Sequence, residues 1–133
     1  MPAGEAHKNF AVAGAAIDAL LSANIERATP ISALGGGVVG DLAGFVAATL
    51  LRGVPLIQIP PTLLAAVDAS VGGKVAVDHH AGKNLIGAFH QPLLVLTDID
   101  TFATLAPREL RCGLAECIKH AVIRDADLFS FIA

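Results

Sequence analysis

The sequence predicts a single α/β domain built on a parallel sheet. Short apolar segments with strand character alternate with longer segments of helical spacing along the 133 residues, and this alternation favours a parallel sheet. The strand segments are apolar throughout, which is typical of burial on both faces. Hydrophobic residues make up 54% of the chain. In so short a chain we therefore expect apolar faces that a partner covers, either another subunit or a further part of the same protein.

Helical spacing and turn residues predict the first elements. Thr29-Pro30 ends a first helix over Ala6–Ala23, Ile31–Leu34 is a short buried strand, and three glycines form the next turn. A second helix over Asp41–Leu51 is apolar nearly all round, which is typical of a buried helix. The apolar residues on one side of the first helix are Phe10, Ala13, Ile17, Leu20 and Leu21.

Prolines and polar residues divide the second half of the chain. A strand over Val54–Ile59 stops at Pro60-Pro61, and Thr62–Val71 is expected to form a short helix. Lys74–Leu85 is polar and interrupted by glycine, so it is expected to be a loop or a hairpin. The remaining elements are a strand over Leu93–Thr97 and helices over Pro107–Ile123 and Asp125–Ile132.

Charge, hydropathy and cysteine spacing exclude several classes of protein. A formal net charge of -3 offers no basic surface for nucleic acid. No stretch has the roughly 20 apolar residues that a membrane-spanning helix needs, and the N-terminus lacks the basic and apolar segments of a secretory signal. Cys112 and Cys117 lie five residues apart in a helical segment, hence on different faces. We expect both to be reduced, in a cytoplasmic chain.

A glycine-rich turn joins the first strand to the second helix. Gly35, Gly37 and Gly40 match the spacing G-x-G-x-x-G, in which glycines let the backbone approach a phosphate at a helix N-terminus. The strand–turn–helix context favours a dinucleotide-binding domain, and a tight turn with close helix packing is the alternative. The next strand carries no acidic residue for a ribose hydroxyl, so such a site is a variant of the ordinary one.

A second dense group of polar residues follows at positions 68–84. Lys74, Lys83 and Asn84 suit an anionic, oxygen-rich ligand, and a solvated loop is an equally good interpretation. His79 and His80 are adjacent in an extended segment. We expect them to point to opposite faces and to be surface residues rather than joint metal ligands.

The helix that starts at Pro107 carries a third polar group. Glu116, Lys119 and His120 share one face of this helix. A carboxylate and an imidazole four residues apart are able to bind zinc. Spacing alone favours an ordinary ion pair at the helix surface.

Four motifs follow one another along the chain, at Gly35–Asp41, Asp68–Lys74, Gly82–Phe89 and Glu109–His120. In this order they resemble the 3-dehydroquinate synthase family of the sugar-phosphate cyclases, and the likeness runs over nearly the whole chain. The resemblance implies an NAD- and metal-dependent lyase of the shikimate pathway, which makes aromatic amino acids. Its substrate is a seven-carbon sugar-acid phosphate. The implied assembly is a cytoplasmic homodimer.

The implied reaction begins with oxidation of one ring alcohol by NAD. Phosphate is then eliminated, the ketone is reduced again, and an intramolecular aldol step closes the carbocycle. A divalent metal, zinc or cobalt, is expected to polarise the alcohol and carbonyl oxygens as a Lewis acid.

The resemblance also implies roles for individual residues. Asp68, Lys74, Asn84 and Lys119 match substrate-facing positions, and Arg52 matches an arginine offered to the phosphate in the neighbouring subunit. Glu116 matches a metal ligand, whereas His120 falls at a variable position. The implied NAD contacts are Glu5, Lys8, Gly37, Val38, Val39, Gly40, Asp41, Pro61, Thr62, Lys74, Lys83, Thr101, Phe102, Ala103 and Thr104.

The chain departs from the family pattern at a few positions and in length. Pro61 replaces the usual Thr and lacks its hydroxyl and backbone N–H, while Asp78 replaces Asn and Cys117 replaces Val. The resemblance places residues 1–108 in an NAD-binding α/β domain. It places residues 109–133 at the start of a helical domain that is largely absent and that supplies two histidines to the metal.

We therefore expect an incomplete piece of the enzyme, without activity on its own. A related cyclase of the inosose or valiolone type is one alternative. An inactive NAD-binding or dimerisation module is the other.

Overall fold

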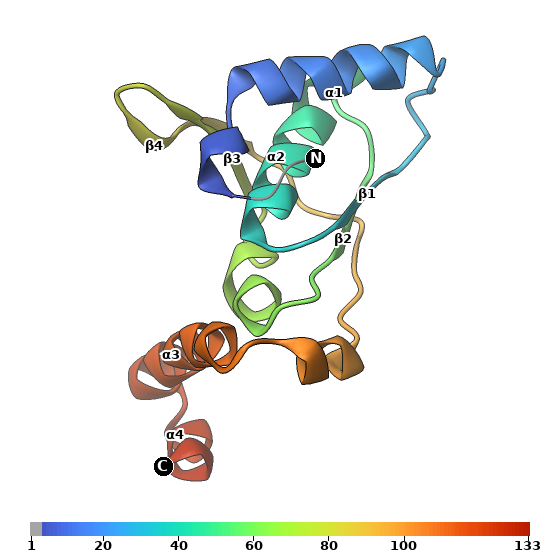
Figure 1. Cartoon of the computed structure of the whole chain (residues 1–133). Coiled ribbons are helices and arrows are strands. Elements are labelled where there is room, and N and C mark those ends of the chain that lie inside the picture. Colours follow the sequence, from blue (N-terminus) through green and yellow to red (C-terminus); the bar gives the residue numbers. More distant parts are fainter. Residues whose placement is uncertain (1–3) are drawn as a thin grey trace.

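A computed structural model describes residues 4–133 of the chain, and Figure 1 shows their arrangement. The prediction that the N-terminus is no secretory signal falls partly on residues 1–3, outside the described residues. The elements are η1 (Glu5–His7), α1 (Phe10–Ser22), β1 (Ile31–Leu34), α2 (Gly37–Thr49), η2 (Leu50–Arg52), β2 (Leu56–Ile59), η3 (Ala65–Ala69), β3 (Lys74–His79), β4 (Gly82–Phe89), β5 (Leu94–Val95), η4 (Ile99–Thr104), α3 (Pro107–Arg124) and α4 (Ala126–Ile132).

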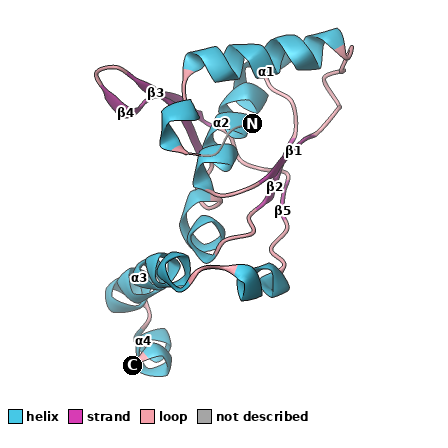
Figure 2. Ribbon diagram, in the orientation of Figure 1, coloured by secondary structure: helices cyan, strands magenta, loops and turns pink. Residues whose placement is uncertain are grey.

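The predicted parallel sheet is confirmed. Its strand order is β1-β2-β5, with Ile31 opposite Leu56 and Ile57 opposite Leu94, and Figure 2 shows the three strands side by side. The prediction that the strands are buried on both faces is wrong for β1 and β5. Leu34 is 66% exposed while its neighbour Ala33 is buried, because α2 packs against one face of the sheet and leaves the outer residues of these strands open.

Helix α2 lies at the centre of the packing, as its apolar sequence predicted. One side of it packs with α1 and β3 around Leu42, Phe45, Val46 and Val77. Its other side meets the sheet, where Ala47 joins Ala33, Val54 and Leu56. The helix begins at Gly37 rather than at the predicted Asp41, because packing overrides the low helix propensity of glycine.

Helix α1 begins later than predicted, at Phe10 instead of Ala6. The Asn9 side chain accepts a hydrogen bond of 3.1 Å from the Val12 amide, which is an N-cap. Phe10 meets Phe45 edge to face with 5.7 Å between ring centroids. Leu21, predicted on the apolar side, is instead exposed at the end of the helix.

Strands β3 and β4 form an antiparallel hairpin, which decides between the two predictions for this segment. The hairpin extends to Phe89, beyond the predicted Leu85. The prediction that His79 and His80 point to opposite faces is wrong. Their ring centroids lie 3.8 Å apart, because the chain turns at this point and is no longer extended; both residues are exposed, as predicted.

Helices α3 and α4 form the C-terminal end of the structure, at the bottom of Figure 1. Helix α3 approaches the segment before η3 closely at Gly113, where a Cβ atom would lie 2.6 Å from Leu63 Cγ. Cys112 and Cys117 are free on this helix. Among residues 4–133, no helix is both long and apolar enough to cross a membrane. The division into domains at residue 108 stays a prediction.

Candidate functional site

The glycine turn between β1 and α2 contains three glycines that packing requires. A Cβ atom would lie 2.6 Å from Val39 Cγ2 at Gly35, and 2.8 Å from Gln58 Oε1 at Gly40. At Gly37 it would lie 3.3 Å from the Ala69 side chain. These positions fit the tight turn and the close helix packing that the glycine spacing predicted.

Gly36 is different from the other glycines of this turn. Its backbone is extended, with φ -68° and ψ -175°, so any residue can adopt it. The nearest atom to a Cβ built there is Thr62 Oγ1, 4.0 Å away. Neither the backbone nor the packing of the described residues demands glycine, and the open space lies at the N-terminus of α2, where free amides and the helix dipole favour an anion. The turn therefore fits a phosphate group. The NAD contacts predicted for this turn began at Gly37 and omitted Gly36.

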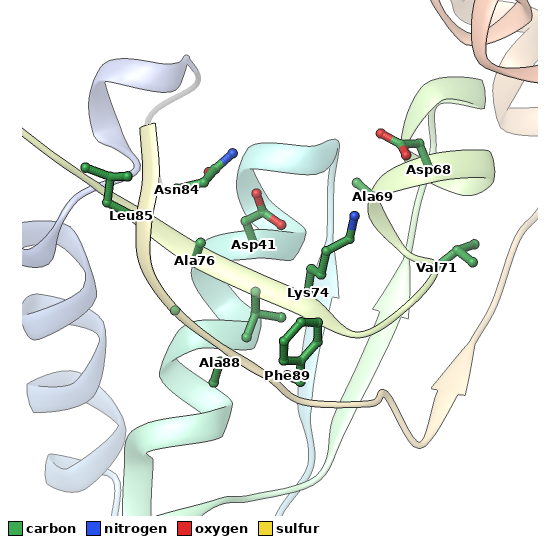
Figure 3. Close-up of a pocket in the computed structure, with 12 residues that line it drawn as sticks. Asp41, Asp68, Ala69, Val71, Lys74, Ala76, Asn84, Leu85, Ala88 and Phe89 are labelled. Atoms are coloured by element: carbon green, nitrogen blue, oxygen red, sulfur yellow. The ribbon is translucent and has the colours of Figure 1, made fainter. Parts of the chain in front are cut away.

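A pocket of about 480 Å³ opens beside this turn. Four of the predicted site residues line it, each from a different part of the chain: Asp41 from α2, Asp68 from η3, Lys74 from β3 and Asn84 from β4. Figure 3 shows the Lys74 side chain extending between the carboxylates of Asp41 and Asp68. The rest of the lining is mostly apolar and comes from Ala69, Val71, Val75, Ala76, Leu85, Gly87, Ala88 and Phe89.

Charged side chains support the wall of this pocket from behind. Lys8 Nζ donates hydrogen bonds to Asp41 Oδ2 at 3.1 Å and to Asn84 Oδ1 at 2.6 Å. Burial lowers the pKa of Lys8, but the hydrogen bonds and charges of Asp41 and Glu5 outweigh it and hold this pKa above its ordinary value. Burial raises the pKa of Asp41 above its ordinary value, and the charges of Glu5 and Asp78 add to the rise against the opposing effect of Lys8.

The middle of α3 brings a second group of predicted residues together. Lys119 donates a hydrogen bond to the Glu116 carboxylate, three residues earlier on α3. This bond raises the pKa of Lys119, and the charges of Glu116 and Asp68 contribute to the rise. His120 is exposed at the surface, and among residues 4–133 no group of three His, Cys, Asp or Glu side chains forms a metal site.

Other predicted residues lie near the pocket without lining it. Thr62 and Pro61 adjoin the glycine turn, where Thr62 Oγ1 accepts from the Ala65 amide at 3.2 Å. Val38 and Val39 lie in the first turn of α2. Lys83 is 71% exposed, and its Nζ lies 3.4 Å from Glu5 Oε1.

Two further predicted groups are separate from the pocket. Thr101, Phe102, Ala103 and Thr104 belong to η4, which is held by its own hydrogen bonds. Arg52 is exposed at the end of η2, with φ +68° beside Leu51 at +52°. Two successive non-glycine residues in the left-handed region are unusual, and they turn the chain sharply into Gly53.

Sequence reasoning also missed Asp78 as part of this site. Its Oδ1 accepts a hydrogen bond of 2.9 Å from the backbone N–H of Asn84, and it lies 3.8 Å from Lys8 Nζ. In the comparison with the family pattern, Asp78 was noted only as a replacement for the usual asparagine. Its position across the hairpin from Asn84 was the available signal.

The parallel sheet, the glycine turn at the start of α2 and the adjoining polar pocket together define an α/β domain of the dinucleotide-binding type. Residues 1–112 match the model of the family described as 3-dehydroquinate synthase N-terminal. The chain belongs to the 3-dehydroquinate synthase family.

Curated relatives agree with this assignment. The chain is 59% identical over 132 residues to 3-dehydroquinate synthase of Nitrosomonas europaea, and 60% identical over 129 residues to that of Salinibacter ruber. These matches cover 99% and 97% of the chain. They cover 36% and 35% of the relatives, so the chain spans about a third of their length.

Solved structures of sugar-phosphate cyclases share the fold. The 2-epi-5-epi-valiolone synthase of Streptomyces hygroscopicus subsp. jinggangensis, solved with NAD+ and Zn2+ bound, superimposes with a TM-score of 0.94 at 37% identity, over 99% of this chain and 37% of its own. A 2-deoxy-scyllo-inosose synthase complexed with carbaglucose-6-phosphate, NAD+ and Co2+ gives 0.89 at 33% identity, over 92% and 34%. An iron-containing alcohol dehydrogenase of Thermotoga maritima, at 17% identity and a TM-score of 0.71 over 92% and 37%, shares the fold alone.

Proposed function

We propose that this chain carries the NAD-binding part of a 3-dehydroquinate synthase active site. The enzyme eliminates phosphate from a seven-carbon sugar-acid phosphate and closes the carbocycle. The observation that carries the proposal is the convergence of Asp41, Asp68, Lys74 and Asn84, from four separate elements, on one pocket beside the start of α2.

The glycine turn is the proposed site of the NAD pyrophosphate. The open space at Gly36 and the N-terminal amides of α2 support this placement, and Thr62 is close enough to border the same space. Bound there, NAD would supply reversible hydride transfer to and from the substrate. The protein's own contribution is to hold the dinucleotide so that its reactive end faces the pocket. The other NAD contacts that the family resemblance implies, including Lys83 and residues 101–104, are part of the same proposal, with the exception of Lys8, which is buried behind the pocket wall.

The pocket residues are proposed to bind the substrate. The ammonium groups of Lys74 and Lys119 suit its phosphate and carboxylate oxygens. The Asn84 amide is a hydrogen-bonding partner for a substrate hydroxyl or carbonyl oxygen. The apolar lining of the pocket strengthens these polar contacts by lowering the local dielectric.

Glu116 is proposed as one ligand of a divalent metal, zinc or cobalt. A catalytic zinc site takes three protein ligands, and residues 4–133 alone do not supply such a set. The remaining ligands are assigned to parts of the enzyme outside this chain. Glu116 is partly buried on α3 and paired with Lys119, a proposed substrate residue, so metal and substrate are proposed to meet at this helix.

The remaining proposals concern assembly and cellular role. Arg52, exposed beside the left-handed turn at Leu51, is proposed to reach the phosphate in a neighbouring subunit of a homodimer. The enzyme is proposed to act in the cytoplasm, in the shikimate pathway. Identities of 54–60% to curated 3-dehydroquinate synthases, against 33–37% to the solved inosose and valiolone synthases, favour this substrate over those of the related cyclases.

Calorimetric titration of the 133-residue protein with NAD tests the cofactor site. Saturable binding supports the proposal, and Lys74→Met is expected to weaken it. A chimera in which this chain replaces the matching 132 residues of the Nitrosomonas europaea enzyme tests the reaction, by release of phosphate from the seven-carbon substrate with NAD and zinc. A chimera that folds and binds NAD but releases no phosphate, or that prefers an inosose or valiolone precursor, contradicts it.

A further inference from the structure

Lys8 occupies a buried junction behind the pocket wall. It is 4% exposed. Besides Asp41 and Asn84, its Nζ lies 3.2 Å from Glu5 Oε1 and 3.8 Å from Asp78 Oδ1. An ammonium group has three N–H donors and accepts nothing. Two of them are used in the hydrogen bonds to Asn84 and Asp41, and the ion pair with Glu5 surrounds the ammonium further, so the group is directed at the protein rather than at a ligand in the pocket.

The Asn84 amide is oriented by this contact. The atom that faces an ammonium must be an acceptor, so it is Oδ1, and the Nδ2 group points away from Lys8. The backbone is fixed too, because φ is +57° and the Asn84 N–H donates to Asp78 Oδ1. Asparagine tolerates this left-handed conformation better than most residues. Asn84 therefore presents an N–H donor to the pocket that it lines.

The Asp41 carboxylate is oriented in the complementary sense. Its Oδ2 accepts from Lys8, and within residues 4–133 no hydrogen bond reaches Oδ1. Every buried side-chain oxygen in this described part has a hydrogen-bond partner. Because Oδ1 has none, it is not buried, and it is accessible at the pocket that Asp41 lines. Asp41 therefore presents a carboxylate acceptor where Asn84 presents a donor.

We propose that Lys8 is a positioning residue that sets the hydrogen-bonding polarity of the pocket, an acceptor at Asp41 and a donor at Asn84. Lys8 acts on the ligand through these two side chains rather than by touching it. The identity of that ligand as NAD and a sugar phosphate rests on the proposed function, whereas the arrangement of Lys8, Asp41 and Asn84 stands on the contacts themselves.

The variant Lys8→Met tests this role in the 133-residue protein, because methionine keeps the length of the side chain and removes its donors. Three readouts are expected to change together. The Asn84 side-chain amide resonances shift as the amide loses its fixed orientation. The Asp41 carboxyl titrates at higher pH, with Glu5 and Asp78 left as its charged neighbours. NAD affinity falls about tenfold or more, because Asp41 and Asn84 are no longer held in the orientation that lets them hydrogen-bond to the ligand, and one hydrogen bond that involves a charged group contributes about this much.

Arg27→Met is the matched charge control. Arg27 is exposed, in the segment that follows the C-terminal end of α1, and the same loss of one positive charge there is expected to leave all three readouts unchanged. A double-mutant cycle separates positioning from direct contact. If Lys8 acts through Asp41 and Asn84, adding Lys8→Met to Asp41→Asn/Asn84→Ala weakens NAD binding no further. An additive loss overturns the proposal.

Asp41→Asn and Asn84→Ala keep the test decisive if Lys8→Met fails to fold. Each alters a residue on the pocket wall and is expected to shift the ¹⁵N resonance of the Lys8 ammonium. Unchanged Lys8 resonances in both variants overturn the proposal, as do unchanged Asp41 and Asn84 resonances in Lys8→Met. If the resonances shift but the wild-type protein binds no NAD, the positioning role is upheld and the proposed function fails.

Discussion

We expect Gly44→Ala to destabilise the protein, although alanine normally favours a helix. Gly44 lies in the middle of α2, where the helix crosses β3. A Cβ atom there would lie 2.9 Å from Val75 Cβ and closer still to Val75 Cγ1, and 3.4 Å from Leu56 Cδ2. Val75 and Leu56 are fully buried, so neither side chain is able to move aside without disturbing the core.

The expected magnitude is the difference between two opposing effects. Overpacking a core costs about 1–3 kcal/mol, and so deep an overlap belongs at the upper end. Replacing glycine by alanine in a helix returns about 1 kcal/mol. The net loss in the free energy of unfolding is about 2 kcal/mol, which moves the midpoint of a urea transition down by about 1 M.

Gly14→Ala is the matched control in urea unfolding followed by circular dichroism. Gly14 lies inside α1, and a Cβ atom there meets nothing within 4 Å, so this variant is expected to gain up to about 1 kcal/mol. The double variant Gly44→Ala/Val75→Ala is expected to lose less than the sum of its single variants, because Val75→Ala removes the clashing methyl groups. A Gly44→Ala protein as stable as Gly14→Ala would refute the close packing of α2 on β3.

Three further outcomes are expected. Gly36→Ala is expected to weaken NAD binding in calorimetry while leaving the urea midpoint unchanged, because its Cβ enters space that no described side chain fills; unchanged affinity contradicts the phosphate site. The Lys8 pKa lies above 10.5 in the folded protein, so its contribution to stability is present below that pH and lost as the pH rises through the raised value. Urea unfolding measured across this pH range is expected to show a decline in the free energy of unfolding of the wild type that Lys8→Met lacks. Parallel declines in the two proteins would contradict this contribution of Lys8. The 133-residue protein is expected not to bind zinc tightly through Glu116, because residues 4–133 hold no three-ligand group. Equilibrium dialysis that finds one tight zinc site in the wild type, lost in Glu116→Gln, contradicts this.

Local signals in the sequence were sufficient for most of the elements, whereas much of the pocket followed from the family resemblance. The apolar run of α2 predicted its central position, and the strand at Ile31–Leu34 has the predicted bounds. Polar patterning indicated Lys74 and Asn84, whereas Asp41 and Asp68 were assigned by the family resemblance, and all four line the pocket. The glycine spacing predicted the turn because this pattern is typical of a strand that leads into a closely packed helix, even though the contacts of Gly37 and Gly40 are with the distant residues Ala69 and Gln58.

Features that depend on tertiary contacts were not predictable in this way. Periodicity gives no measure of which sheet face is covered, so the exposure of Leu34 was missed. Alternation rules for a strand do not apply at a turn, so the close approach of the His79 and His80 rings was missed. Lys8 was selected as a ligand contact, yet only the folded chain shows that its ammonium is buried among Asp41, Asn84 and Glu5.

The relative positions of the pocket residues depend on close contacts between the elements that carry them. Its four polar residues come from α2, η3, β3 and β4, and two glycines set the spacing of these elements: Gly44 brings α2 onto β3, and Gly113 brings α3 onto the segment before η3. A side chain at either position would push apart elements that carry Asp41, Lys74, Asp68 and Lys119. Displacements of about 1 Å at a functional site cost far more in activity than in stability. Gly44→Ala is therefore expected to lower NAD affinity even in conditions where the variant is fully folded, whereas Gly14→Ala is not.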